Sequence, residues 1–355
     1  MIVVGAGPAG SQAAVSAAHQ MRHVALLDAS RVSRSRGRAY WSKSVAIEDA
    51  PVFPAATGPE FMRALRRWVR AQPETPIRIA GASRWTGIRV IDAFAVRLRR
   101  ASDATFELDV RGERVGRAGE VVPTATLRGR TVVVASGFDD AWPAIEVDAQ
   151  AQRLYQRYRT VFRYAGTRRG WHVCIRCDGH LHVDEHLAIV GAGGYIFDVV
   201  QGAQDFTHRV TILTNGRPLG MSPSVEAAIR RRGIDVEEEP IAAHIGRGVD
   251  LLGLRLASGR ELFFNGFFVD EGLTPNDRYL AGFDLARGDD GLLRCDASHR
   301  VLDAAARPIP GLWACGDIVH GERKLIATAF GSGQDAGLEA SDSLRDWRRP
   351  GDEAK

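Results

Sequence analysis

Cysteine and lysine are both scarce in this chain of 355 residues. Its four cysteines, Cys174, Cys177, Cys295 and Cys315, are too few for a disulfide framework. Only three of the 47 basic residues are lysines, so the net charge of +4 comes from arginine and by itself indicates no partner. The sequence also lacks any run of 18 or more apolar residues, and we therefore expect no membrane-spanning helix.

The chain opens on a short apolar strand and a glycine loop, without the charged and then apolar plan of a signal peptide. We therefore expect a cytoplasmic protein. In a reducing compartment, the Cys-x-x-Cys pair at 174 and 177 indicates redox chemistry or metal binding rather than a structural disulfide. The length favours two domains.

Apolar runs of strand length alternate with helical stretches, which predicts α/β domains with parallel sheets. Two strand–glycine loop–helix units stand out, one beginning at residue 2 and the other at residue 186. We expect strands at 2–4, 24–27, 131–135, 186–190, 210–213, 252–256, 263–269 and 312–314, helices at 8–20, 61–71, 195–203 and 327–344, and a β-meander at 94–126.

The first glycine loop, Gly5-Ala6-Gly7-Pro8-Ala9-Gly10, lies between a predicted strand and a predicted helix. In a dinucleotide-binding loop, the first glycine makes a tight turn, the second lets the backbone approach the pyrophosphate, and the third allows close helix–strand packing. The helix N-terminus favours the phosphate charges. Asp28 ends the next strand, 18 residues later, and is expected to accept hydrogen bonds from the adenosine ribose. The loop therefore predicts a bound dinucleotide.

Two later segments resemble the flavin-binding parts of two-dinucleotide-domain flavoproteins. Ala135-Ser136-Gly137 resembles their Ala-Thr-Gly strand end, and Gly316-Asp317 resembles their Gly-Asp segment, whose Asp bonds the flavin ribityl chain. A glycine-rich helix start at 331–333 follows, as in that group, where the helix points its N-terminus at the isoalloxazine. The resemblance implies FAD at the first site, held by Gly5, Gly7, Pro8, Ala9, Gly10, Asp28, Ala135, Gly137, Gly316, Asp317, Lys324, Leu325 and Ile326.

The cysteine pair stands in Cys174-Ile175-Arg176-Cys177-Asp178-Gly179-His180, about a dozen residues before the second glycine loop. This order resembles the low-molecular-weight thioredoxin reductases, over essentially the whole chain. The resemblance implies that Cys177 faces the flavin and Cys174 exchanges with a substrate disulfide. Asp178, together with His180, would carry the proton. Arg176 and His180 are candidates to supply the positive charge that lowers a thiol pKa.

The same resemblance implies an α/β fold of two Rossmann-like, three-layer ββα dinucleotide-binding domains. Residues 1–141 and 276–355 would form the FAD domain, and 142–275 an inserted redox domain. A homodimer and thioredoxin, or a similar disulfide protein, as partner are implied as well. Two other readings of the cysteines stay open. They are inert core residues, or a zinc site with the histidines that follow, namely His180, His182 and His186.

The second glycine loop departs from the NADPH-dependent members of the family. It reads Gly191-Ala192-Gly193-Gly194-Tyr195-Ile196, so a branched side chain stands where a third small residue is expected. Thr214-Asn215-Gly216 occupies the place of the His-Arg-Arg clamp for the 2′-phosphate, and only Arg217 follows. We expect a degenerate nicotinamide site, although a divergent NADPH site remains the alternative.

Electrons would then come from elsewhere, and the chain resembles the deeply rooted and ferredoxin-dependent flavin thioredoxin reductases. No acidic residue occurs across the 29 positions between Asp148 and Asp178. A basic, aromatic segment of this kind suits an acidic carrier such as ferredoxin, and no RNA-binding signature accompanies it. The segment contains Arg153, Arg157, Arg159, Arg163, Arg168, Arg169 and Arg176, interleaved with Tyr155, Tyr158, Phe162 and Tyr164. The alternative is an arginine-rich helix that is exposed to solvent and binds no carrier.

Two further functions are weighed against a reductase. In a dithiol oxidase, O₂ would reoxidise the flavin while the cysteines oxidise a dithiol; such relatives tend to carry His after the second Cys, and Asp178 argues against this function. A non-catalytic flavin-bound redox sensor is the third hypothesis, which unchanged function after Cys174→Ser would favour.

Overall fold

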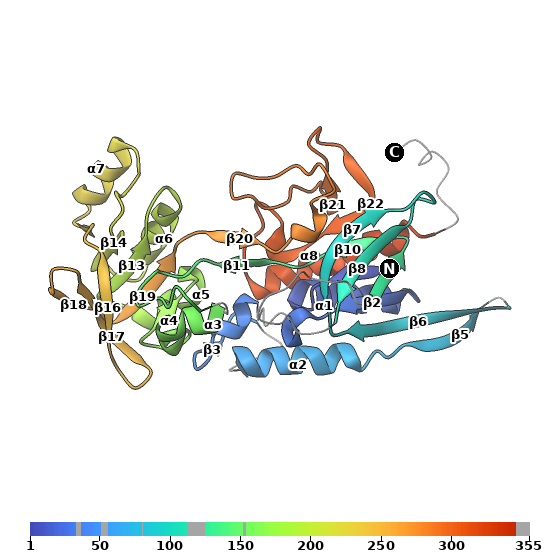
Figure 1. The fold of residues 1–355 in the computed structure, drawn as a ribbon, viewed down its shortest axis with the longest axis horizontal. Coiled ribbons are helices and arrows are strands. Elements are labelled where there is room, and N and C mark those ends of the chain that lie inside the picture. Colours follow the sequence, from blue (N-terminus) through green and yellow to red (C-terminus); the bar gives the residue numbers. More distant parts are fainter. Residues whose placement is uncertain (33–36, 51–55, 80, 113–124, 152–153, 346–355) are drawn as a thin grey trace. The chain divides into compact units, whose positions relative to one another are not determined.

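The computed structural model describes residues 1–32, 37–50, 56–79, 81–112, 125–151 and 154–345 (Figure 1). The chain divides into two compact units. Unit 1 comprises Met1–Ala39, Glu60–Asp139 and Pro275–Lys355, and unit 2 comprises Tyr40–Pro59 and Asp140–Thr274. Residues 40–59, which we expected in the first domain, group instead with the second unit.

A seven-stranded sheet forms the core of unit 1, in the order β21-β22-β10-β1-β2-β6-β5. The five central strands run parallel, and the outer two pair antiparallel with their neighbours. The bounds are β1 Ile2–Val4, β2 His23–Leu27, β5 Thr75–Ile79, β6 Ala82–Ile91, β10 Val132–Val134, β21 Arg300–Leu302 and β22 Pro308–Ala314. Wholly apolar β1 and β10 are buried on both faces, as is typical of parallel sheets.

Three helices accompany this sheet: α1 (Pro8–His19), α2 (Gly58–Arg70) and α8 (Ile326–Asp342). Helices α1 and α8 approach each other closely because small residues line their contact. A Cβ atom on Gly333 would lie 2.2 Å from the carbonyl oxygen of Ala9, and one on Gly337 2.5 Å from that of Ala13. Helix α8 begins at Ile326, so Gly331 and Gly333 lie inside it rather than at its start; Gly333 makes room for α1, and Gly331 is exposed.

An antiparallel sheet β7-β8-β9 also belongs to unit 1. Its strands are β7 Phe94–Arg100, β8 Phe106–Arg111 and β9 Ala125–Gly129. Side chains alternate across a strand, so Val3 of β1 packs with the α1–α8 layer while Ile2 contacts Gly129 at the end of β9. Within the expected meander at 94–126, residues 113–124 lie outside the described residues.

Unit 2 has its own parallel sheet, in the order β12-β19-β13-β14-β15. An antiparallel sheet β16-β17-β18 accompanies it. The strands are β12 Trp171–His172, β13 Leu187–Gly191, β14 Val210–Leu213, β15 Asp235–Glu237, β16 Ile241–Arg247, β17 Asp250–Leu256, β18 Glu261–Phe263 and β19 Gly266–Asp270; the helices are α3 Leu154–Arg157, α4 Arg159–Tyr164, α5 Ile175–Asp178, α6 Tyr195–Ala203 and α7 Pro223–Arg231.

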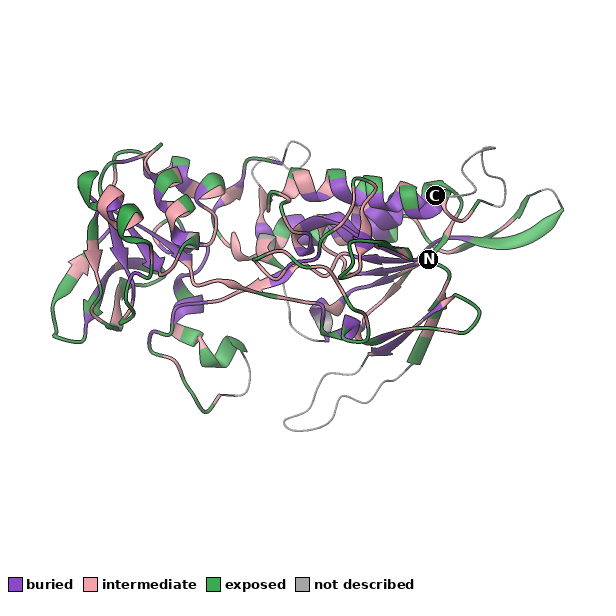
Figure 2. Cartoon of the chain, turned by 90° about the horizontal axis from the view of Figure 1, so that it is seen from above, coloured by how far each residue is buried: buried purple, intermediate pink, exposed green. Residues whose placement is uncertain are grey.

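The remaining elements are short. They are the pairs β3 (Ala46–Ile47) with β4 (Ala56–Thr57) and β11 (Phe138–Asp140) with β20 (Leu273–Pro275), and 3₁₀ turns at Ala29–Arg31, Arg38–Trp41, Gly179–His182, Arg278–Leu280 and Gly316–Ile318. Figure 2 shows buried residues concentrated on the central strands of each unit. In the described part of the chain, no helix has the length and apolar character needed to cross a membrane.

Candidate active site

The loops predicted to bind FAD meet at one edge of the unit 1 sheet. Strand β1 lies between β2 and β10, β22 lies beyond β10, and all four are parallel and in register. Parallel strands present their carboxyl ends at the same edge, which is where α/β sheets bind ligands. The loops that leave this edge carry Gly5, Asp28, Ala135 and Gly316, and the structure thus brings together candidates that lie far apart in sequence.

The first glycine loop fits a pyrophosphate. Gly5 has a φ of 109°, and a Cβ atom there would lie 2.3 Å from the carbonyl oxygen of Ala135. A Cβ atom on Gly10 would lie 1.9 Å from the carbonyl oxygen of Gly5, so the third glycine lets helix and strand touch. A Cβ atom on Gly7 would meet nothing within 4 Å. Gly7 caps α1 without a side-chain hydrogen bond and Pro8 follows, which leaves backbone N–H groups at this helix end for an anion.

Asp28 is buried at the end of β2 and already has two partners. Its Oδ1 accepts a hydrogen bond from the Ser30 backbone at 3.0 Å, and its Oδ2 accepts one from Arg66 Nε at 3.1 Å. A carboxylate has about four acceptor sites, so capacity for the ribose hydroxyls remains. Arg66 was not among the predicted residues; its only signal is its place on the arginine-bearing face of α2.

The ribityl-binding candidates also lie together. Gly137 has a φ of 61°, and a Cβ atom there would lie 3.9 Å from Cβ of Asp317. Burial raises the pKa of the Asp317 carboxyl group, although Arg38 and Lys324 oppose the shift. Lys324 Nζ donates to the Val319 carbonyl at 2.6 Å. Leu325 is the N-cap of α8 without a side-chain hydrogen bond and Ile326 is its first residue, so this helix end is also uncapped.

Cys174 and Cys177 are joined by a disulfide bond in unit 2. Cys174 is the N-cap of α5, where its Sγ accepts a hydrogen bond from the backbone N–H of Cys177 at 3.1 Å. Both cysteines are partly exposed. The following Gly179 is required because a Cβ atom there would lie 2.3 Å from the ring of Phe206. The pair is therefore formed, accessible and held by a tight local structure.

The two predicted proton carriers have different partners. Asp178 Oδ2 lies 2.8 Å from Nδ1 of His172, a buried residue of β12. His180 is exposed, and its Nε2 lies 2.9 Å from Oε2 of Glu48. His172 was not among the predicted residues; the available signal was a histidine inside an otherwise apolar segment, two residues before Cys174.

Contacts within unit 2 already occupy the second glycine loop. The backbone N–H of Gly193 donates to the carbonyl of Leu219 at 2.8 Å. Ile196 is fully buried in the core of unit 2, and its Cγ2 methyl lies 2.7 Å from where a Cβ atom on Gly191 would stand. The branched side chain is thus accommodated by turning inward, while an amide that a dinucleotide phosphate would use already has an acceptor.

The edge around this loop is acidic. Arg217, the only basic residue near the expected clamp, donates to Oε2 of Glu271 at 2.5 Å and to the Thr214 carbonyl at 3.2 Å. Burial raises the pKa of Glu271, although Arg217 opposes the shift. Strands β13 and β19 pair so that Gly191 lies opposite Asp270. The carboxyl groups of Asp270 and Glu271 therefore lie at the end of β19, beside the loop. The Arg217 guanidinium is already bound to Glu271.

The basic segment is only partly as expected. Four of its arginines are exposed between 154 and 168, and Arg176 is exposed as well. Tyr155 is 60% exposed, but Phe162 and Tyr164 are buried. Phe162 stacks on Trp41 with ring centroids 4.6 Å apart, so it belongs to the core of unit 2 and not to a docking surface. Arg153 lies outside the described residues.

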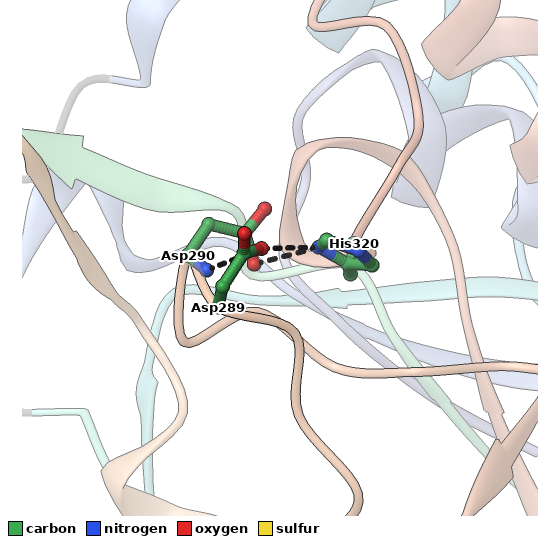
Figure 3. A group of neighbouring side chains, drawn as sticks. All are labelled: Asp289, Asp290 and His320. Atoms are coloured by element: carbon green, nitrogen blue, oxygen red, sulfur yellow. Dashed lines mark hydrogen bonds and ion pairs between the residues drawn. The ribbon is translucent and has the colours of Figure 1, made fainter. Parts of the chain in front are cut away.

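The zinc reading receives no support from the side chains named for it. The two sulfur atoms bond each other, His186 Nε2 lies 2.9 Å from Thr211 Oγ1, and His182 Nδ1 lies 2.7 Å from Glu185 Oε2. The described residues contain one group close enough for a metal ion, and it is a different one: Asp289, Asp290 and His320 in unit 1 (Figure 3). His320 there makes contacts with both carboxylates, and nothing further marks the group as a metal site.

Comparison with known proteins decides the family. The model of the pyridine nucleotide-disulphide oxidoreductases matches residues 1–333. The chain belongs to this family. Its members are FAD-binding flavoproteins, and the glycine loop, Asp28 and the Gly316–Asp317 segment fit this cofactor. The family's members are disulfide oxidoreductases that use FAD, and the carboxyl edge of the unit 1 sheet is the candidate site for this cofactor.

Curated relatives of this oxidoreductase include the F subunits of alkyl hydroperoxide reductases. The protein from Pseudomonas putida is 25% identical over 351 residues, and that from Pseudomonas aeruginosa is 24% identical over 355 residues. Each comparison covers 97% of this chain but 58% of the relative, so the chain spans less than two thirds of these relatives' length.

Solved structures show that the fold is similar to that of thioredoxin reductases. The enzyme from Streptococcus pyogenes matches with a TM-score of 0.72 at 19% identity, over 97% of both chains. The enzyme from Giardia duodenalis matches with a TM-score of 0.69 at 17% identity, again over 97% of both. The predicted two-domain α/β dinucleotide-binding fold is confirmed.

Proposed function

We propose that this oxidoreductase reduces a protein disulfide through the Cys174–Cys177 pair, with electrons that reach FAD from ferredoxin rather than from NADPH. Unit 1 is the FAD-binding domain and unit 2 the redox domain, in a homodimer. Bound FAD supplies chemistry in which electrons arrive singly or in pairs and leave as a pair. The observation that carries the disulfide step is the bonded, partly exposed cysteine pair followed directly by Asp178.

The cysteines divide the work according to their positions. Once the pair is reduced, Cys174 attacks the substrate disulfide as a thiolate and forms a mixed disulfide, which Cys177 resolves. Asp178 holds and donates a proton at Oδ2. The exposed His180 passes protons between Asp178 and solvent. Thioredoxin is the proposed substrate. The curated relatives belong to alkyl hydroperoxide reductases, so a peroxide-reducing disulfide protein belongs in the same assay.

Three contacts support a donor other than nicotinamide. Gly193 gives its N–H to Leu219, Arg217 is bound to Glu271, and Asp270 stands opposite Gly191 in the sheet. A pyrophosphate at this loop would therefore lack a free donor at Gly193 and would lie near two carboxyl groups. The Arg217 guanidinium is already bound to Glu271 and does not offset the phosphate charge, while the unfavourable contact of Asp270 with a phosphate weakens binding.

The exposed arginines between 154 and 176 support an acidic carrier. Arg159 begins α4, and Arg157 and Arg163 are exposed on the same segment, which leads toward the cysteine pair. Positive charge gathered on one segment accelerates encounter with a negatively charged protein, and the effect falls steeply with added salt. An acidic one-electron carrier of the ferredoxin kind matches this charge.

Anaerobic mixing with different donors tests the proposal. Reduced ferredoxin is expected to bleach the flavin absorbance of the oxidised protein, while NADPH and NADH leave it unchanged over the same time. The rate with ferredoxin is expected to fall about tenfold between low and high salt, because charge steering is screened. Photoreduction of the same sample provides the control that the flavin can be bleached at all.

A matched pair of variants sharpens this test. Arg159→Glu is expected to slow reduction by ferredoxin about tenfold, whereas Arg231→Glu, an exposed arginine of α7, leaves it unchanged. Rapid bleaching by NADPH would overturn the proposed donor and favour a nicotinamide site with a divergent clamp. Rapid O₂ consumption with a small dithiol, without reduction of thioredoxin, would favour the dithiol oxidase.

A further inference from the structure

Two buried histidines lie close to the redox disulfide in sequence: His172, which was not predicted as a site residue, and His182, which was named only for the zinc alternative. His172 is 2% exposed and His182 is 0% exposed. The ring of Phe268 stacks on His172 at 5.1 Å between centroids and meets His182 edge-on at 5.9 Å. A Cβ atom on Gly266 would lie 2.7 Å from Cε1 of His182, so this glycine makes room for the ring. Buried polar rings need hydrogen-bond partners, and each partner here is identifiable.

The partners form one chain of contacts that starts beside Cys177. Asp178 Oδ2 lies 2.8 Å from His172 Nδ1. His172 Nε2 lies 3.4 Å from His182 Nε2, and His182 Nδ1 lies 2.7 Å from Glu185 Oε2. Glu185 is partly exposed and also accepts a hydrogen bond from Arg168 at 3.3 Å. The four side chains thus connect Asp178 to the surface.

The donor and the acceptor of each hydrogen bond can be assigned in turn, starting from Glu185 at the surface. Burial raises the pKa of Glu185, but the hydrogen bonds from His182 and Arg168 outweigh it and place the pKa below its usual value. Glu185 is therefore a carboxylate, and His182 Nδ1 donates to it. Burial lowers the pKa of His182, so the ring is neutral and its Nε2 accepts a hydrogen bond from His172.

A second acceptor beside His172 also requires a hydrogen on Nε2. Its Nε2 lies 3.2 Å from the carbonyl oxygen of Arg168, a group that can only accept. Nε2 of His172 therefore carries a hydrogen. The remaining contact, Nδ1 to Asp178 Oδ2, needs one proton, because without it two lone pairs would face each other at 2.8 Å. The pair is either imidazolium with carboxylate or imidazole with carboxylic acid.

We infer that His172 is a positioning residue that keeps one proton on the Asp178–His172 pair at neutral pH, ready for the sulfur released when the Cys174–Cys177 bond is reduced. A carboxyl group without such a partner is ionised at this pH and would have no proton to give. This inference rests on the proposed function. It adds to it the means by which Asp178 stays loaded.

The step balances in electrons and protons. Two-electron reduction of the Sγ–Sγ bond, for which bound FAD would supply the electrons, gives one thiolate and one thiol and consumes one proton. Asp178 gives that proton, and the pair takes another from solvent. The charged groups that face the two rings are Asp178 of α5, Glu185 and Arg168; β19 presents Phe268 and Gly266, which do not titrate.

Nitrogen NMR of the oxidised protein with labelled histidine tests the proton directly, without any donor or substrate. We expect Nε2 of His172 to be protonated and a downfield, slowly exchanging proton between Nδ1 and Asp178 at neutral pH, absent in Asp178→Asn. An unprotonated Nδ1 beside an ionised Asp178 at neutral pH would overturn the inference.

The pH profile supplies the functional test. The photoreduced protein is mixed anaerobically with oxidised thioredoxin, and flavin reoxidation is followed. His172→Asn keeps an amide N–H at the place of Nδ1 but holds no transferable proton. We expect its rate to be about a hundredfold lower near pH 7 and to recover as the pH falls, because solvent then supplies the proton that His172 no longer holds. His186→Asn, a partly buried histidine bonded to Thr211, is the control and should keep the wild-type profile.

The outcomes separate this inference from the proposed function. A rate that is lower by the same factor at every pH would show a purely structural role for His172 and overturn the inference. If His172→Asn fails to fold, Gly266→Ala displaces the His182 ring and is expected to shift the profile in the same direction by a smaller amount. Wild-type protein that never reduces thioredoxin contradicts the proposed function, while the NMR result still decides the proton.

Discussion

Replacing Cys174 with serine is expected to abolish disulfide reduction and to leave FAD bound. A hydroxyl group cannot form the mixed disulfide, and removal of one member of a catalytic pair typically costs at least about a thousandfold in rate. The cysteines belong to unit 2 and the glycine loop to unit 1, so the flavin absorbance per chain should not change. The measurement is thioredoxin reduction by photoreduced protein, with the flavin content of each sample determined beside it.

Cys295→Ser is the matched control for this loss. Burial, with Glu322 and Asp296 nearby, raises the pKa of the Cys295 thiol to about 12, so almost no thiolate exists at neutral pH. Its replacement should change the rate less than about twofold. Equal losses in both serine variants, or full activity in Cys174→Ser, would refute the assignment and favour a flavin-bound sensor.

Gly10→Ala is expected to yield a protein without flavin. The added methyl group would lie 1.9 Å from the carbonyl oxygen of Gly5, so α1 or the loop must move away from the place where the pyrophosphate binds. Overpacking of this kind costs roughly 3 kcal/mol of folding free energy. The checks are flavin absorbance per chain and the free energy of unfolding from denaturant titration.

Gly331→Ala provides the same substitution where nothing opposes it. Gly331 is exposed inside α8, and a Cβ atom there meets no atom within 4 Å. Because alanine favours a helix over glycine, the free energy of unfolding should rise by up to about 1 kcal/mol, with FAD retained. Retention of FAD by Gly10→Ala would show that the loop is not the pyrophosphate site.

Local patterns in the sequence predicted the strands, the glycine loop and the helix of unit 1 that carry the candidate site. The order of strand, glycine loop and helix at residues 2–20 is specified by near neighbours, since Gly5 needs a positive φ and Gly10 a close contact with the loop. The strand ends at Ala135 and Ala314 follow from apolar runs that a parallel sheet buries. Residues 40–59 could not be assigned in this way, because their place in unit 2 depends on contacts such as that of Trp41 with Phe162.

The sequence did not predict contacts between residues that lie far apart in the chain. Arg217 and Glu271 are 54 positions apart, and their ion pair forms because β13 pairs both with β14, which Arg217 follows, and with β19, which Glu271 follows. The same holds for Gly193 and Leu219. His172 is near Asp178 in the chain, yet its role depends on burial beneath Phe268, which no local pattern reveals. Tyr164 and Phe162 likewise belong to the core of unit 2, although their place in a basic segment had suggested a surface position.

Anaerobic reductive titration tests the central claim most directly, namely that FAD and the Cys174–Cys177 pair share electrons in one protein. We expect wild-type protein to take up four electrons per chain, two for the flavin and two for the disulfide, and Cys174→Ser to take up two. Two electrons in both proteins, or wild-type material that holds no flavin, would contradict the account.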